Sequence, residues 1–393
     1  MRAPGLRRGH AAGSADMTRG AGALRVALVH DWLTGMRGGE KVLEVLCELY
    51  PDASLFTLVH VPGTVGPTIE RLRPRASFLS HLPGIARVYR HLLPLFPAAV
   101  ESFDLDEYDL VISTSHCAVK SVVRPGRARH VSYCHTPMRY VWDQRQAYFG
   151  PQRLGRATSA ALRPVLAWLA RWDAATAGRV DRYVANSQHV ARRIGRYYNR
   201  RATVVHPPVD TDFFCPGDGA RGSGALIVSA LVPYKRLDVA IEACRLAGVR
   251  LRIVGQGPEL ARLRRQAGPE VEFMGPRSNE EIRELYRASA AVLLPGEEDF
   301  GIVPVEAQAC GRPVVAVALG GALETVVDGE TGVLVPPGSA EAMAEGLRRA
   351  LAAPFDAGAI RRHAEGFSRS RFASRMAAVV DETLATARGQ VTW

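Results

Sequence analysis

The stretch Leu293-Leu-Pro-Gly-Glu-Glu-Asp-Phe-Gly-Ile-Val-Pro-Val-Glu-Ala-Gln-Ala-Cys-Gly-Arg-Pro-Val-Val-Ala-Val317 decides the fold. It begins within an apolar run, residues 290–294, that is typical of a buried parallel strand. An acidic loop follows, and we expect a helix to begin near Ile302. Gly311 predicts the end of that helix, and Pro313 begins a second apolar strand.

Two carboxylates and three backbone amides gather around the start of this helix. Glu298 lies in the preceding loop, and Glu306 lies in the second helical turn, where we expect it to face inward. The N–H groups of Phe300, Gly301 and Ile302 should point out of a helix N-terminus above a sheet edge. Such a place holds anions well, so the stretch predicts an anion-binding site.

Apolar strands and helical segments alternate along the chain in two separate runs, one before and one after a segment rich in proline and turns at 207–224. Regular strand–helix units predict a parallel, doubly wound sheet in each half. We therefore expect an α/β protein with two sheets. The expected divisions are a disordered basic tail at 1–22, a first domain at 23–208, a second domain at 209–366 and a C-terminal segment at 367–393, helical over 367–386, that crosses back to the first domain.

Composition limits the class of protein. The 393 residues are enough for two domains, with 47% apolar and 23% charged residues, as in a soluble globular enzyme. No apolar run approaches the roughly 18 residues needed to span a bilayer. The first 22 residues lack the apolar core of a secretory signal, and Met17 is an alternative start. Six cysteines without Cys-x-x-Cys spacing predict reduced thiols and no zinc site.

The net charge of +11 points to anionic partners. Residues 151–206 contain eleven arginines and two aspartates, which suits phosphate-bearing ligands, an anionic membrane surface or a simply solvated basic face. Residues 77–103 mix leucine, proline, phenylalanine and arginine, which fits either contact with the membrane interface or ordinary packing. No nucleic-acid-binding motif is present, so we expect no nucleic acid partner.

Two further segments carry candidate ligand-binding groups. Gly38 and Gly39 open a helix directly after the first strand, and they allow a phosphate or sugar to approach the backbone. The fuller Gly-x-Gly-x-x-Gly pattern is absent, which argues against a dinucleotide site. His135 follows the strand at 129–134, at the sheet edge where open α/β sheets bind ligands, and His116 is a weaker candidate in a similar loop.

Glu298 and Glu306, which have seven residues between them within this strand, loop and helix, resemble the donor-site signature of retaining nucleotide-sugar glycosyltransferases. From about Leu24 to Ala385 the chain is similar to the GT-B type of the large family four. The resemblance implies two Rossmann-like domains facing across a cleft. It also implies transfer with retention of anomeric configuration and without a metal or another cofactor.

The resemblance assigns roles to individual residues. His135 and Glu298 are expected to be catalytic, and Asp31, Trp32 and Arg139 are expected on the acceptor side. The expected donor-binding residues are Gly38, Gly39, Lys235, Arg236, Gly255, Phe300, Gly301, Ile302 and Glu306.

One departure from the family pattern concerns the donor diphosphate. The family has an arginine five residues before the lysine that corresponds to Lys235, and both contact the diphosphate. This chain has Ala230 at the arginine position, so we expect Arg236 to supply the second charge.

The segment that begins at His135 and the loop with Asp31 and Trp32 resemble a mannosyltransferase subgroup, which implies GDP-mannose as donor. The acceptor would then be a polyprenyl-diphosphate-linked saccharide, met in the cytoplasm or at the inner face of the cell membrane, in polysaccharide assembly. Three alternatives stay open: a UDP-sugar donor, a nucleotide-sugar epimerase of similar fold, and a catalytically silent scaffold that binds sugar nucleotides.

Overall fold

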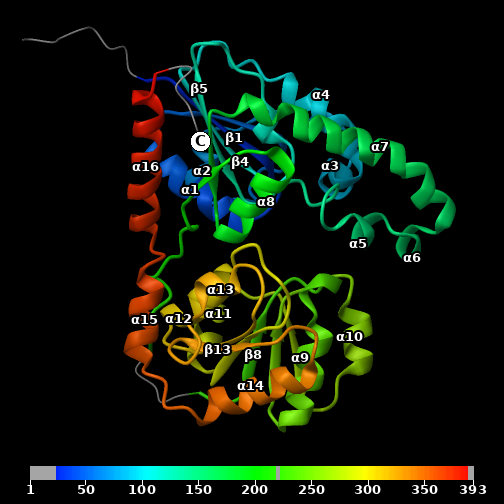
Figure 1. Cartoon of the computed structure of the whole chain (residues 1–393), viewed down its shortest axis with the longest axis vertical. Helices are drawn as coiled ribbons and strands as arrows, with labels where there is room; N and C mark the ends of the chain where they lie inside the picture. The colour runs from blue at the N-terminus through cyan, green and yellow to red at the C-terminus, as the bar shows by residue number, and fades with distance from the viewer. Residues whose placement is uncertain (1–23, 218–221, 388–393) are drawn as a thin grey trace, which may run out of the picture.

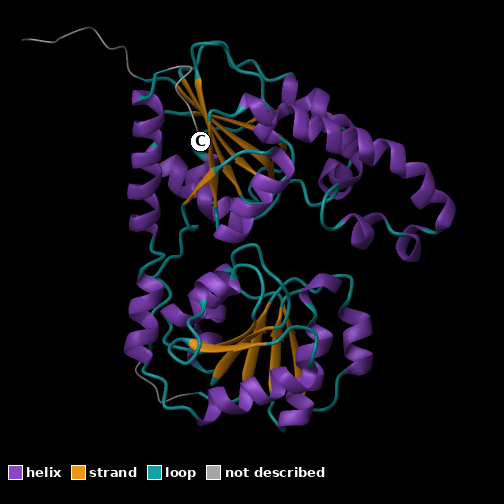
Figure 2. Ribbon diagram, viewed as in Figure 1, coloured by secondary structure: helices purple, strands orange, loops and turns teal. Residues whose placement is uncertain are grey.

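The computed structural model of the chain describes residues 24–217 and 222–387, and it contains two parallel β-sheets, one above the other in Figure 1. The expected tail at 1–22, with Met17, lies outside the described residues. Helices lie on both faces of each sheet (Figure 2), and each face has its own cluster of buried apolar side chains. The predicted pair of doubly wound parallel sheets is thus confirmed.

All seven strands of the first sheet are parallel, in the order β3-β2-β1-β4-β5-β6-β7. The order reverses between β1 and β4, and ligands of open α/β sheets bind at such a reversal. The strands are β1 (Val26–Leu33), β2 (Ser54–His60), β3 (Arg75–Ala76), β4 (Leu110–Ser115), β5 (Arg129–Cys134), β6 (Arg182–Ala185) and β7 (Ala202–Val204).

Helices of the first domain connect and cover these strands. Pro164 lies inside the long helix α7, and none of the described helices is both long and apolar enough to pass through a bilayer. The α-helices are α1 (Gly38–Leu49), α2 (Pro67–Glu70), α3 (Ile85–Val88), α4 (Phe96–Glu101), α5 (Arg145–Phe149), α6 (Pro151–Leu154), α7 (Arg156–Ala175) and α8 (Gln188–Tyr198). The 3-10 helices are η1 (Phe78–His81), η2 (Tyr89–Leu95), η3 (Val119–Ser121) and η4 (Thr176–Arg179).

The second sheet has six parallel strands in the order β10-β9-β8-β11-β12-β13, which reverses between β8 and β11. The strands are β8 (Ala225–Val228), β9 (Leu251–Val254), β10 (Val271–Gly275), β11 (Ala291–Leu294), β12 (Val314–Val317) and β13 (Gly332–Val335). The helices are η5 (Pro233–Lys235), α9 (Leu237–Ala247), α10 (Leu260–Gln266), α11 (Asn279–Arg287), α12 (Ile302–Ala309), α13 (Ala322–Thr325), α14 (Ala340–Ala352) and α15 (Ala357–Glu365).

Helix α12 has the limits that its sequence predicts. It begins at Ile302 after Gly301, whose φ of +91° favours glycine, and Pro304 lies in its first turn. It ends at Ala309, just before Gly311, whose φ is +73°. The helix is therefore held between two turns that fix where its N-terminus meets the first domain.

Helix α16 (Arg369–Ala385) returns to the first domain. Its side chains Phe372 and Met376 are buried in the apolar cluster that covers one face of the first sheet. The chain therefore crosses between the domains twice. The two crossings lie side by side, because the N–H of Val209 donates to the carbonyl of Phe367 at 2.9 Å.

Candidate functional site

Two loops of the second domain form one wall of the candidate site. The first loop contains η5 and follows β8, the second contains Glu298 and follows β11, and both leave the sheet where the strand order reverses. The Lys235 ammonium forms an ion pair with the Glu298 carboxylate. A Cβ atom on Gly296 would lie 2.6 Å from the carbonyl oxygen of Tyr234, so this close approach of the two loops requires glycine.

The surroundings fix the charge of Lys235. Burial disfavours the charged form of Lys235, but the adjacent Glu298 carboxylate outweighs burial and raises the lysine pKa. The lysine is therefore charged at neutral pH. An anion that binds here meets a cation that has already left bulk water and is already held in position, which is the arrangement that stabilises developing negative charge most strongly.

Glu306 points into the domain interface from the second turn of α12, and it is only 5% exposed. Its Oε1 accepts a hydrogen bond of 2.6 Å from the ammonium of Lys41 in α1. Its Oε2 accepts one of 3.0 Å from the hydroxyl of Tyr286. We did not anticipate either partner from the sequence, because they lie 265 and 20 residues from Glu306 and no local pattern links them.

The Gly38–Gly39 turn lies between the two domains. A Cβ atom on Gly38 would be 2.9 Å from Cδ1 of Ile302, the first residue of α12. A Cβ atom on Gly39 would be 3.6 Å from Nε2 of His135. The turn thus brings the start of α12 and the His135 ring to the same backbone segment, and the expected contact of Gly38 and Gly39 with the donor stays a prediction.

His135 leaves the end of β5 with its backbone anchored on both sides. Its N–H donates to the carbonyl of Ser115 at 2.8 Å, and its carbonyl accepts from the amide nitrogen of Asn186 at 2.9 Å. The ring atom Nε2 is buried and has no hydrogen-bond partner. Burial, with smaller effects from His116 and another histidine, His30, lowers the pKa of His135 well below 6.5, so the ring is neutral at neutral pH. A buried ring nitrogen without a partner is available to a ligand.

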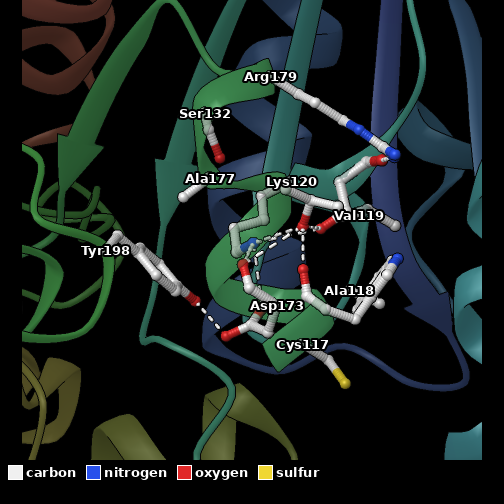
Figure 3. A network of polar contacts seen from close by, with 12 residues as sticks. Cys117, Ala118, Val119, Lys120, Ser132, Asp173, Ala177, Arg179 and Tyr198 are labelled. Carbon is white, nitrogen blue, oxygen red and sulfur yellow. Dashed lines mark hydrogen bonds and ion pairs between the residues drawn. The ribbon is translucent and has the colours of Figure 1, made fainter. Parts of the chain in front are cut away.

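A buried ion pair supports the segment after His135. Lys120 is 1% exposed, and its ammonium lies 3.0 Å from the Asp173 carboxylate of α7. Figure 3 shows the hydroxyl of Tyr198 pointing at the same carboxylate, at 2.9 Å. The indole N–H of Trp142 donates to it as well, at 2.8 Å. One carboxylate therefore connects the loop after β4, helices α7 and α8, and the segment that begins at His135.

The structure corrects the expected acceptor-side position of Asp31 and Trp32. The Asp31 carboxylate is fully buried and accepts four backbone N–H groups from residues 116–119, at 2.7 to 3.1 Å. Trp32 is buried between Tyr89 and Phe96 and meets the edge of the His116 ring. Both side chains hold the loop after β4 in place, and neither presents a surface to an acceptor.

Arg236 contacts Asp238 in the structure, and its expected role as the second charge on the diphosphate stays a prediction. Arg236 ends η5 in the left-handed region, at φ +50°, and its side chain is 46% exposed. The guanidinium pairs with Asp238 at 3.3 Å, so it faces the first turn of α9. Gly255 is required by packing, since a Cβ atom there would be 1.9 Å from the carbonyl oxygen of Ser229, and its expected contact with the donor stays a prediction. The β9 loop therefore packs directly against the loop that leads to Lys235.

A cluster of charges joins the two domains beside the Lys235–Glu298 pair. Asp299 pairs with both Arg139 and Arg193 of the first domain. Its carbonyl also accepts from the hydroxyl of Ser187 at 2.5 Å. The Arg139 guanidinium reaches the hydroxyl of Tyr234 at 3.3 Å. We did not single out Asp299 or Arg193 from the sequence, although the position of Asp299 next to Glu298 was a usable signal.

Metal ligands are not gathered within the described residues, where no group of three or more His, Cys, Asp or Glu side chains could hold an ion. The expectation of transfer without a metal stays a prediction.

Two family descriptions match the two halves of the chain. Residues 36–213 match the family described as Glycosyltransferase Family 4. Residues 223–366 match the family described as Glycosyl transferases group 1. The matched ranges include α1 and His135 on one side, and Lys235, Glu298 and Glu306 on the other.

Curated relatives align over only part of their length. The D-inositol 3-phosphate glycosyltransferase of Mycobacteroides abscessus is 36% identical over 225 residues, which are 50% of this chain and 50% of the relative. The enzyme of the same name from Mycolicibacterium smegmatis is 39% identical over 180 residues, which are 39% of this chain and 42% of the relative. The chain thus spans about half, or less, of the length of these relatives.

Solved structures share the fold over nearly the whole chain. HepE of Anabaena in complex with UDP and glucose has a TM-score of 0.67 at 19% identity, over 91% of this chain and 100% of that one. Sucrose-phosphate synthase from Thermosynechococcus elongatus has a TM-score of 0.67 at 18% identity, over 93% and 100%. With this architecture, and with family matches over both domains, the chain belongs to the GT-B glycosyltransferases of family four.

Proposed function

We propose that the chain transfers a hexose from a nucleoside diphosphate sugar to an acceptor hydroxyl, with retention of the anomeric configuration. The main support is the arrangement at the domain interface. The charged Lys235–Glu298 pair lies on one side, the unpartnered Nε2 of His135 lies on the other, and the Gly38–Gly39 turn touches both walls. Family membership supports the same reaction.

The bond from the anomeric carbon to the diphosphate oxygen breaks in this reaction, and its electron pair leaves with the phosphate. The acceptor oxygen attacks from the same face, and its proton passes to the departing phosphate oxygen. In our proposal Lys235 and the N–H groups near Gly301 stabilise the growing phosphate charge. Glu298 accepts hydrogen bonds from sugar hydroxyls, and neutral His135 contacts the sugar and the reacting oxygen.

In this proposal the Glu306 carboxylate accepts hydrogen bonds from the ribose hydroxyls of the nucleotide. The carboxylate is buried between the domains. One of its two oxygens accepts a hydrogen bond from the ammonium of Lys41, which is at the end of a long side chain. We propose that the ribose hydroxyls replace Lys41 on this oxygen. The hydrogen bond from Tyr286 keeps the other oxygen in position during that exchange.

GDP-mannose is our proposed donor, on the resemblance of the His135 segment to mannosyltransferases. The second candidate is a UDP-sugar, because the solved HepE structure of the same fold is a complex with UDP and glucose. For the acceptor we propose a polyprenyl-diphosphate-linked saccharide at the cytoplasmic face of the membrane. The name of the relatives, D-inositol 3-phosphate glycosyltransferase, adds an inositol phosphate as an acceptor to test.

A thermal shift experiment separates the donors. The purified chain is melted alone and with GDP-mannose, UDP-glucose or UDP-N-acetylglucosamine. A ligand that binds only the folded state at about 100 times its Kd stabilises that state by about 2.7 kcal/mol, which raises the melting temperature. We expect GDP-mannose alone to produce this shift.

Each other outcome has a defined meaning. A shift with a UDP-sugar alone contradicts the mannose donor and keeps the transferase. A shift that is followed by neither hydrolysis nor transfer, with saccharide lipid and inositol phosphate both offered, supports a silent scaffold. No shift with any of the three donors contradicts the proposed donor site.

A further inference from the structure

The donor domain lacks one positive charge that a diphosphate requires. Ala230, which is exposed at the end of the β8 strand, carries a methyl group where the family pattern has an arginine. Lys235 is the cation of this loop that faces Glu298. Arg236, the next residue, is paired with Asp238 and faces the start of α9. If Lys235 were the only cation at the diphosphate, much of the negative charge of the diphosphate would have no positive partner.

Arg139 of the first domain lies next to Lys235. The Arg139 guanidinium carbon is 5.8 Å from the centre of the Tyr234 ring, and the Lys235 ammonium is 5.3 Å from the same centre. The guanidinium also reaches the Tyr234 hydroxyl at 3.3 Å. The Tyr234 ring thus lies beside two cations that come from different domains. Both cations have left bulk water for the most part, since their side chains are 26% and 15% exposed.

Arg139 already binds an oxyanion in the protein as it stands. Its partner is the carboxylate of Asp299, which immediately follows Glu298 in the loop between β11 and α12. A guanidinium recognises carboxylate and phosphate oxygens through the same planar pair of N–H donors. Asp299 is held by Arg193 as well, so it keeps a cationic partner when Arg139 moves away. Exchange of Asp299 for a phosphate therefore leaves no buried charge unpaired.

We propose that Arg139 supplies, from the first domain, the second positive charge on the donor diphosphate, and that it takes the place of the arginine missing at position 230. This inference rests on the proposed function, and it changes the expected role of Arg139 from acceptor contact to donor binding. Because the cation belongs to the opposite domain, the diphosphate itself draws the two domains together. The family resemblance alone did not indicate this assignment.

The test compares nucleoside diphosphates with monophosphates. Binding of GDP, GMP, UDP and UMP is measured by titration calorimetry for the wild type and for Arg139→Gln, which removes the charge and keeps a planar polar side chain beside Tyr234. We expect Arg139→Gln to weaken binding of the preferred diphosphate by about tenfold or more, because a charged hydrogen bond is lost. Binding of the matching monophosphate should change less than about threefold.

Three further variants separate an effect on binding from an effect on structure. Arg193→Gln removes the other arm of the Asp299 pair, so a purely structural effect would weaken diphosphate binding equally in both variants. Arg236→Gln tests the competing cation. A double variant, Arg139→Gln with Ala230→Arg, restores the family pattern within the donor domain, and we expect it to recover most of the lost affinity for the diphosphate.

Several results would overturn the assignment. These are unchanged diphosphate affinity in Arg139→Gln, an equal loss for monophosphate and diphosphate, an equal loss in Arg193→Gln, a loss confined to Arg236→Gln, or a double variant as weak as the single one. A wild-type chain that binds none of the four nucleotides would instead remove the proposed function itself, and this inference with it. The two failures are therefore distinguishable in one experiment.

Discussion

At the scale of single residues, the proposed donor site depends on the pair of Lys235 and Glu298. Each charge satisfies the other in the structure. A sugar nucleotide carries both partners that the pair needs, since its phosphate attracts the lysine and its hydroxyls donate to the carboxylate. In the proposed site, donor binding therefore exchanges one ion pair for two sets of contacts, and neither buried charge is left alone.

Glu298→Gln preserves the shape of the side chain and removes its charge. We expect the rate of transfer to fall by about 10²–10³-fold, because a neutral amide orients the sugar hydroxyls and Lys235 poorly. Initial rates with the donor found in the melting experiment measure this, and circular dichroism checks the fold. The matched control is Glu297→Gln, since the neighbouring side chain is half exposed and contacts His189. Equal rates in both variants would contradict the assignment of Glu298.

Two histidines of the first domain contribute, together with His135, to the way stability depends on pH. Burial lowers the pKa values of His116 and His130 to about 3, while a histidine in the unfolded chain titrates near 6.5. Between these values the unfolded chain binds protons that the folded chain does not, so the free energy of unfolding falls as the pH drops below 6.5. By pH 5 each histidine should remove about 2 kcal/mol. Urea unfolding at pH 7.5 and pH 5 measures the change, and greater stability at pH 5 would contradict it.

At the scale of elements, local signals predicted what local forces determine. The limits of α12 follow from a glycine before the helix, a proline in its first turn and Gly311 after its end, all within a dozen residues. Asp31 shows the opposite case. Its partners are backbone N–H groups 85 to 88 residues away. Nothing in its own segment therefore indicates that both carboxylate oxygens accept hydrogen bonds within the fold.

The turn that begins α13 packs against the loop that contains Glu298, and this contact predicts the effect of Gly321→Ala. An added Cβ would lie 2.3 Å from the backbone of Phe300, which cannot yield without moving the loop around Glu298. We expect a loss of about 1–3 kcal/mol in the free energy of unfolding, with weaker donor binding. Denaturant titration and calorimetry measure the two effects.

Gly178→Ala is the matched control, because no atom lies within 4 Å of the added Cβ and the glycine does not need a positive φ. Its stability and donor affinity should equal those of the wild type. A Gly321→Ala chain that behaves in the same way would show that the turn does not position the loop.

At the scale of the whole molecule, the sequence predicted both domains but not the contacts between them. Strand and helix patterns are repeated within each half, and they specify each sheet separately. The pairs Lys41–Glu306 and Arg139–Asp299 join residues 265 and 160 positions apart. Such pairs depend on how two finished surfaces meet, and a single sequence carries no periodic signal for that.

Helix α16 belongs to the first domain by its packing, so Phe372→Ala should destabilise that domain. Phe372 is fully buried and its ring meets the ring of Tyr133 edge-on, with centres 5.6 Å apart. Truncation of a buried phenylalanine leaves a cavity, and we expect a loss of about 3–5 kcal/mol. Denaturant unfolding measures it. Arg375→Ala, on the exposed face of the same helix, should change stability by less than about 0.5 kcal/mol, and equal effects would contradict the packing role.

The return of α16 also sets an order for folding on the ribosome. All the strands of the second sheet lie within 225–335, so that domain can form as soon as its own residues have emerged. The core of the first domain includes Phe372, Met376 and Val380, which are synthesised afterwards. During translation, the domain that emerges first therefore waits with one face uncovered until α16 is made, and it is completed after its neighbour.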